Sequence, residues 1–134
     1  MSYVMAAALQ TALYDRLAGD APMAALIGDA VFDAVPAGTL PETYVLLGSE
    51  DVRDLSDRET RAALHDFSVS VVSTASGFLT AKLVAAAIGR ALETGDLALS
   101  EGRVVWLKFQ KAQAKRTDTH RQIDLRYRAH VSAE

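Results

Sequence analysis

The chain of 134 residues contains no cysteine, so disulfide bonds, thiolate catalysis and zinc–thiolate sites are excluded. It has no uninterrupted apolar run of about 18 residues, and a membrane-spanning helix is therefore not expected. Its apolar start lacks a leading Lys or Arg and breaks at Gln10, which argues against an export signal. An excess of basic residues is also missing: the net charge is −3, unlike that of a general nucleic-acid-binding protein.

Motifs for catalysis or cofactor binding are missing as well. The sequence has neither a G-x-S-x-G nucleophile turn nor a G-x-G-x-x-G or Walker phosphate loop. The three histidines, His65, His120 and His130, lack the i, i+2 or i, i+4 spacing that would seed a metal site. A hydrolase using His65 and Asp66 is a weak alternative, because adjacent side chains diverge on a strand. The sequence therefore predicts a protein that is not an enzyme and holds no cofactor or metal.

Hydrophobic periodicity predicts an α+β fold in one domain over residues 1–134. Helices are expected over residues 2–17, 21–27 and 78–92, with Ser2 and Asp20 as N-caps and Gly95 as a stop. Strands are expected over 31–35, 44–48 and 65–74, with a further short strand over 97–99. Helices segregated from hairpin-linked strands favour an antiparallel β-sheet with two main helices packed on one face.

The last third of the chain predicts a tall hairpin with its tip at residues 115–120. Alternate residues are apolar and define a dry face: Val105, Leu107, Phe109, Ile123, Leu125, Tyr127, Ala129 and Val131. The residues between them on the second strand define a charged face: Asp124, Arg126, Arg128 and His130. Such a hairpin has one side for a core and one side for water or a partner.

Residues 50–64 predict a mobile loop, because eight of the residues from Ser49 to Arg61 are charged and few are apolar. Asp51, Asp54 and Asp57 lack the glycine-punctuated pattern of a calcium loop. We therefore interpret this segment as a mobile polar loop outside the core.

Ten residues are candidates for contacts with a subunit or partner: Arg53, Asp54, Asp57, Arg58, Trp106, Arg116, Asp124, Arg126, Arg128 and His130. The basic residues of the hairpin have three interpretations: a ribbon that touches phosphates, an ordinary solvated face, or a polar row that pairs with another copy. Trp106 indicates either a protein contact or cover from residues 50–61.

The order of elements resembles the small tail-completion, or tail-terminator, proteins of long-tailed phages and gene transfer agents. The matching stretches are the N-terminal helix with Leu9, Leu13 and Leu17, residues 26–28, 31–36, 41–48 and 65–73, the alanine-rich helix, and residues 123–129. High Ala, Asp and Arg usage fits a GC-rich bacterial source, which favours the gene-transfer-agent branch.

The resemblance implies a structural virion protein without catalytic residues. Family members form a hexameric ring that caps the tail tube and joins it to the head connector, or stopper. The implied partners are other copies of the chain, the tail tube protein, the connector and DNA that passes through without sequence-specific binding. The implied location is the tail or neck of a particle assembled in the bacterial cytoplasm. A small soluble adaptor that binds another protein, without catalysis, is the alternative.

Overall fold

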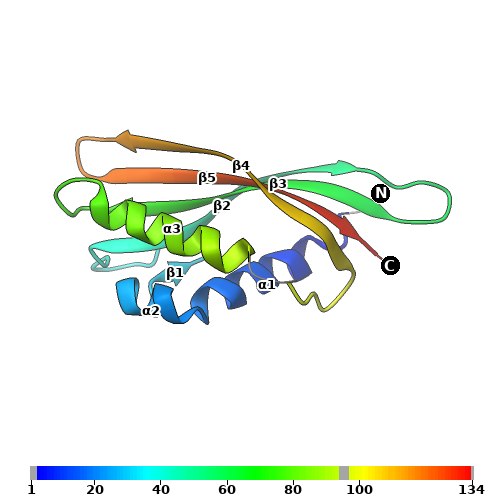
Figure 1. Cartoon of the computed structure of the whole chain (residues 1–134), viewed down its shortest axis with the longest axis horizontal. Coiled ribbons are helices and arrows are strands. Elements are labelled where there is room, and N and C mark those ends of the chain that lie inside the picture. Colours follow the sequence, from blue (N-terminus) through cyan, green and yellow to red (C-terminus); the bar gives the residue numbers. More distant parts are fainter. Residues whose placement is uncertain (1–2, 94–96, 134) are drawn as a thin grey trace.

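The computed structural model describes residues 3–93 and 97–133. In these residues the elements are α1 (Ala6–Ala18), α2 (Ala21–Ile27), β1 (Val31–Phe32), β2 (Thr43–Asp54), β3 (Ala62–Ser73), α3 (Leu79–Glu93), β4 (Arg103–Arg116) and β5 (Arg121–Ser132). The helices form one layer and the strands the other (Figure 1). This arrangement confirms the predicted α+β class.

The sheet has the strand order β1-β2-β3-β5-β4. Neighbouring strands are antiparallel except for β1, which runs parallel to β2. The sheet is therefore mixed, whereas the sequence predicts an antiparallel sheet. β1 is only two residues long and pairs with Val45 and Leu46 alone. The remainder of β2 therefore has a partner strand on one side only.

The helices begin and end close to the predicted positions, and local chemistry explains why. The Asp20 side chain accepts a hydrogen bond from the backbone N–H of Met23 at 3.1 Å, as an N-cap does. α1 begins at Ala6 with Met5 at its N-cap position, so the predicted start at residue 2 with Ser2 as the cap is wrong. The predicted stop Gly95 lies outside the described residues. The short strand predicted over 97–99 is wrong: Leu97 is buried in the core, but this segment joins no strand.

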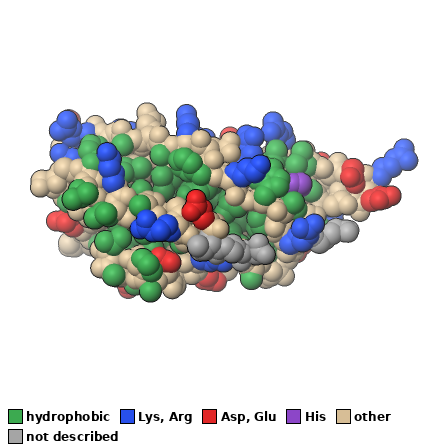
Figure 2. All heavy atoms as spheres, in the orientation of Figure 1, with side chains coloured by type: hydrophobic (Ala, Val, Ile, Leu, Met, Phe, Trp, Pro, Cys, Tyr) green, Lys and Arg blue, Asp and Glu red, His purple; other side chains and the backbone are tan. Residues whose placement is uncertain are grey.

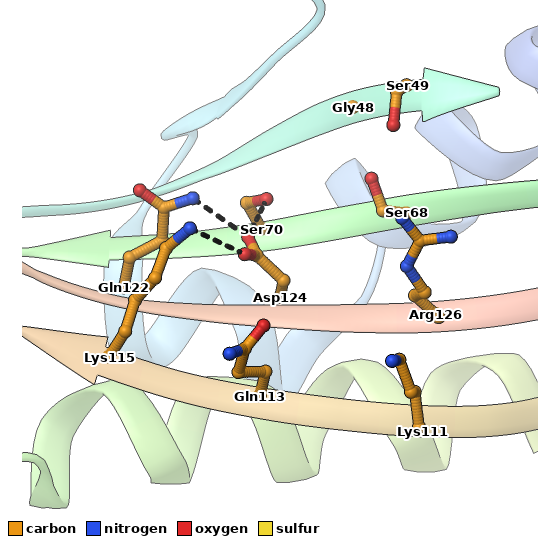
Figure 3. Close-up of a pocket in the computed structure, with 10 residues that line it drawn as sticks. All are labelled: Gly48, Ser49, Ser68, Ser70, Lys111, Gln113, Lys115, Gln122, Asp124 and Arg126. Carbon is orange, nitrogen blue, oxygen red and sulfur yellow. Dashed lines mark hydrogen bonds and ion pairs between the residues drawn. The ribbon is translucent and has the colours of Figure 1, made fainter.

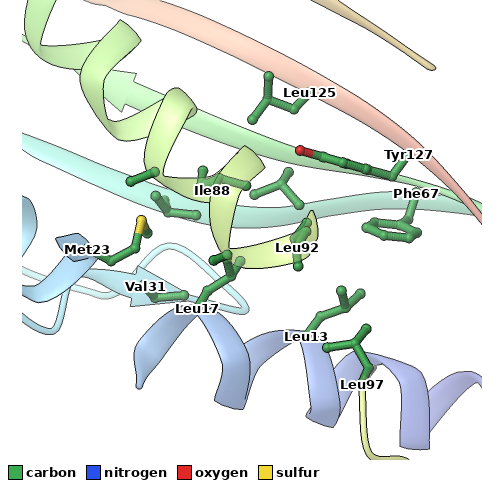
Figure 4. Packing of buried hydrophobic residues seen from close by; sticks show 14 of the residues in the cluster. Leu13, Leu17, Met23, Val31, Phe67, Ile88, Leu92, Leu97, Leu125 and Tyr127 are labelled. Carbon is green, nitrogen blue, oxygen red and sulfur yellow. The ribbon is translucent and has the colours of Figure 1, made fainter. Parts of the chain in front are cut away.

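The core lies between the helices and the face of the sheet that they cover, here called the inner face (Figure 4). The predicted stripe of α1 is confirmed, because Leu9, Leu13 and Leu17 are buried. Alanines of α3 on the same face as Val84 and Ile88 bring that helix close to β3 and β5. β5 contributes every second residue, as the alternating pattern predicted.

The loop predicted over residues 50–64 is wrong at both ends. β2 continues to Asp54 and β3 begins at Ala62, so only residues 55–61 connect them. The two strands form a long hairpin whose tip projects beyond the helices (Figure 1). Strand pairing uses backbone groups, so a charged sequence can form a hairpin wherever its side chains reach water. The mobility of residues 55–61 stays a prediction.

The dry face predicted for β4 is wrong in its register and in its burial. Irregularities between Val104 and Trp106, and between Phe109 and Lys111, each add one residue and shift the alternation. The side chains opposite buried residues of β5 are consequently Val104, Leu107, Phe109, Ala112 and Ala114. Phe109 is 55% exposed, because α3 packs mainly on β3 and β5 and covers little of β4.

Replacement of Ile88 by alanine is expected to lower the free energy of unfolding by about 2–5 kcal/mol, because Ile88 is fully buried and its loss leaves a cavity. Leu83→Ala on the exposed side of the same helix is the control and is expected to cost under about 1 kcal/mol. Urea unfolding of both variants measures the difference, and equal losses would contradict the described packing of α3.

Candidate interaction surface

The face of the sheet away from the helices, here called the outer face, carries the predicted polar row. A shallow hollow of about 420 Å³ crosses it over four strands (Figure 3). It is lined by Gly48, Ser49, Ser68, Ser70, Lys111, Gln113, Lys115, Gln122, Asp124 and Arg126. The lining side chains are mostly polar, and three of them, Ser70, Gln122 and Lys115, contact one carboxylate.

That carboxylate is Asp124. It accepts hydrogen bonds from Ser70 Oγ at 2.6 Å and Gln122 Nε2 at 2.8 Å, and it pairs with Lys115 Nζ at 3.3 Å. Burial disfavours its ionised form, but these hydrogen bonds and the charge of Lys115 outweigh burial and hold the pKa of Asp124 below its usual value. Asp124 therefore ties β3, β4 and β5 together at neutral pH.

A second row of charges lies across the same face. Arg128 donates two hydrogen bonds to Asp66, from Nε to Oδ1 at 2.7 Å and from Nη2 to Oδ2 at 3.2 Å. The hydrogen bond and charge of Asp66 raise the pKa of Arg128. By strand register, Lys108 lies beside Arg128 and Asp51 beside Asp66. From β4 to β2, the row therefore contains two cations, Lys108 and Arg128, and then two anions, Asp66 and Asp51.

Trp106 contacts residues of its own hairpin. Its ring meets His130 edge to face at 5.7 Å between centroids, and Lys108 Nζ lies 4.7 Å from its centroid. A cation so placed is attracted to the face of the ring. The side chain is therefore partly buried on the outer face, as the register of Trp106 opposite His130 requires.

The other predicted contact residues lie at the tip of the β2–β3 hairpin. Asp57 accepts backbone hydrogen bonds from Glu59 at 2.9 Å and Thr60 at 2.8 Å, which lower the pKa of its carboxyl group. Asp54 accepts a hydrogen bond from Ser56 Oγ at 2.8 Å. Arg53 and Arg58 are exposed beside them. Asp57 therefore has a local role, since it holds the turn together.

The ten candidates do not form one site. Arg53, Asp54, Asp57 and Arg58 belong to the hairpin tip, whereas Trp106, Asp124, Arg126, Arg128 and His130 belong to the outer face. Arg116 lies at the end of β4, opposite Arg121. Their role as contact residues stays a prediction.

His65 and Asp66 point to opposite faces of β3. His65 is fully buried, and its Nδ1 lies 3.0 Å from Glu50 Oε2. Tyr3 donates a hydrogen bond to the other oxygen of Glu50 at 3.2 Å, and this contact raises the pKa of Tyr3. Asp66 instead pairs with Arg128 on the outer face. The two residues of the hydrolase alternative therefore do not converge on a common reacting atom.

Several apolar residues of β4 and α3 are exposed, and the hydrophobic periodicity of the sequence does not predict this exposure. Phe109 and Val105 on β4, and Leu79 and Leu83 on α3, are 39–71% exposed. Hydrophobic side chains gather in the middle of the face that Figure 2 shows. Phe109 packs edge to face on Tyr127 at 5.6 Å, and burial, with the nearby charge of Glu93, raises the pKa of Tyr127 to about 12.

A groove lies at the opposite edge of the sheet, between α1 and the β1–β2 pair. Its volume is about 480 Å³. It is lined by Gln10, Thr11, Tyr14, Val31, Phe32, Asp33, Ala34 and Leu47, and a smaller hollow continues along β2 past Leu47 and Gly48 to Glu50. We call this feature the α1–β2 groove.

Over residues 3–93 and 97–133, three or more His, Asp or Glu side chains never gather closely enough to hold a metal ion. Within the same residues, each helix is too short or too polar to span a membrane.

Residues 11–132 match the family model described as tail completion protein gp17. The chain belongs to this family. It is therefore a structural tail protein, and the predicted resemblance is confirmed. No curated protein matches it. Among solved structures, it is similar to a chain described as "Virion of native gene transfer agent (GTA) particle", with 53% identity and a TM-score of 0.92. The alignment covers 98% of this chain and 99% of that chain.

Replacement of Asp124 by asparagine is expected to lower the free energy of unfolding at pH 7 by about 1 kcal/mol, because charged hydrogen bonds are lost. The folded-state pKa of Asp124 is lowered, so its contribution is present above the unfolded pKa and is lost as the pH falls through the folded pKa. Denaturant unfolding from pH 7 to pH 2 should therefore show wild type and variant converging in acid.

Asp118→Asn in the exposed β4–β5 turn is the matched control, expected to stay within about 0.5 kcal/mol of wild type. A loss for Asp124→Asn that is independent of pH would contradict the role given to its charge.

Proposed function

We propose that the chain is a tail terminator: a ring, hexameric in the assembled particle, that caps the tail tube and joins it to the head connector. The observation that carries the proposal is the match over almost the full length of both chains to a chain of a native gene transfer agent virion. At 53% identity, surface residues as well as the core are shared to a large extent, which supports a common place in a common kind of particle.

The structure fits an assembly role without catalysis. Its charged side chains form pairs within a sheet face, such as Arg128 with Asp66, instead of converging in an enclosed cleft. A ring requires two different surfaces of one subunit to meet, which is a heterologous contact. The β4 side and the α1–β2 groove are two such surfaces at opposite edges of one sheet.

The partners of this ring are further copies of the chain, the tail tube protein, the head connector and DNA in transit. The net charge of −3 is compatible with a channel through which DNA slides without sequence-specific binding. The location is the tail or neck of a phage-like particle or gene transfer agent that is assembled in the bacterial cytoplasm.

Deletion of the gene from the producing cells tests the proposal. Electron microscopy is expected to reveal tails separated from heads, and reintroduction of the wild-type gene to restore joined particles. Native mass spectrometry of complexes released from wild-type particles is expected to detect six copies together. Normally joined particles from the deletion strain would contradict the proposal.

A further inference from the structure

Both edges of the sheet offer unpaired backbone groups. On one side, β4 pairs with β5 alone, and no strand of the described residues lies along its other edge. On the other side, β1 covers only Val45 and Leu46, which leaves residues 47–54 of β2 open. An open strand edge is a template for pairing with another chain.

From Val104 to Ala114, the inner face of the β4 edge carries no charge. Lys108, Lys111 and Lys115 all lie opposite outer-face residues of β5. On the inner face from Val104 to Ala114, which the structure describes throughout, the residues are apolar. Inward-pointing charge is a common device against edge-to-edge association, and β4 does not use it on this face. The lysines of β4 therefore leave its inner face free for an apolar contact, while on the outer face they call for a partner edge of opposite charge.

The geometry of the sheet selects the partner edge. Along the order β2, β3, β5, β4 each strand is antiparallel to the next, so β4 runs opposite to β2. A copy rotated about an axis along the strands keeps its strand directions. Its β2 would then lie antiparallel to β4 of the first copy, and the alternation would continue without interruption.

The charged row on the outer face is complementary at its two ends. Arg128 and Asp66 neutralise each other in the middle of the row. Lys108 at the β4 end and Asp51 at the β2 end have no oppositely charged partner among the described residues. When β4 lies beside β2 of another copy at the same level, Lys108 meets Asp51.

On the inner face, an aromatic side chain of β4 lies at the same level as one end of the α1–β2 groove. Phe109 lies in one row with Tyr127, Phe67 and Glu50. The α1–β2 groove includes Leu47 and continues to Glu50. In a sheet shared by two copies, Phe109 of one copy points to the same side as α1 of the other and lies at the level of Glu50, at the narrow end of this groove.

We propose that β4 of one copy pairs antiparallel with residues 47–54 of β2 in the next copy, with Lys108 against Asp51 and Phe109 in the α1–β2 groove. This interface rests on the proposed ring, whose subunit contacts it defines. It makes the sheets of successive subunits continuous.

A charge exchange tests the interface. Lys108 and Asp51 of one chain lie three strand spacings apart, about 14 Å, and cannot pair with each other. Lys108→Glu and Asp51→Lys are each expected to lower the incorporation of the chain into particles at least about tenfold, because like charges meet between copies. The double variant is expected to restore incorporation, and failure to restore it would overturn the pairing.

Phe109→Glu tests the apolar contact and is expected to reduce incorporation by about tenfold or more, because a charge cannot enter the groove. Leu79→Glu is the matched control, because Leu79 is 71% exposed and belongs to α3, outside the proposed strand pair. Thermal unfolding of both variants should stay close to wild type, since both side chains are exposed in the free chain. Equal incorporation of the two variants would contradict the proposal.

Cross-linking separates this interface from the ring itself. The chain has no cysteine, and Lys111 and Ser49 lie at the same level of the outer face. Particles carrying Ser49→Cys and Lys111→Cys on one chain are expected to give a ladder of cross-linked copies, whereas either single variant gives none. A dimer from Lys111→Cys alone, or rings without a ladder, would overturn the interface and leave the ring standing. Particles without any multimer of the chain would overturn the ring.

Discussion

Backbone hydrogen bonding at the edge of β4 is the constraint on which the rest of the structure depends. The strand has 14 residues and, within residues 3–93 and 97–133, pairs with β5 alone, so about half of its N–H and C=O groups point away from the sheet. α3 packs mainly on β3 and β5 and covers little of β4, and Phe109 is left exposed. A chain with its own core therefore carries one long strand with an open edge, which is a template for pairing with another strand.

The core between the helices and the sheet stabilises the subunit, and the contacts on the outer face hold the strands in register. Residues such as Val69, Val84 and Ile88 bury the apolar surface that stabilises a single subunit. The outer face fixes the relative positions of β3, β4 and β5 through Asp124 and Arg128. Because the strands are held in register, the charges at the two edges arrive at matching levels. Strand pairing thus turns a sequence pattern into an ordered row of charges across the sheet.

The sequence alone predicts those features that depend on local periodicity. The stripe of α1, the Asp20 cap and the alternation of β5 were all predicted correctly. The burial of β4 was not, since a residue added at a bulge changes which face the next side chain occupies. The sequence predicts a loop over residues 50–54, but these residues belong to β2. They are mostly charged because this part of the strand projects past the core, and the strand therefore lacks a hydrophobic pattern. The exposure of Phe109 depends on where α3 packs, which period-two alternation does not encode.

A density map of this chain within its own particle tests the central claim most directly. The account predicts a sheet that continues from one subunit to the next, with β4 antiparallel to residues 47–54 of β2 in the neighbour. It also predicts density for Phe109 between α1 and β2 of that neighbour. A map in which β4 stays unpaired, or pairs with a second β4, would contradict the account.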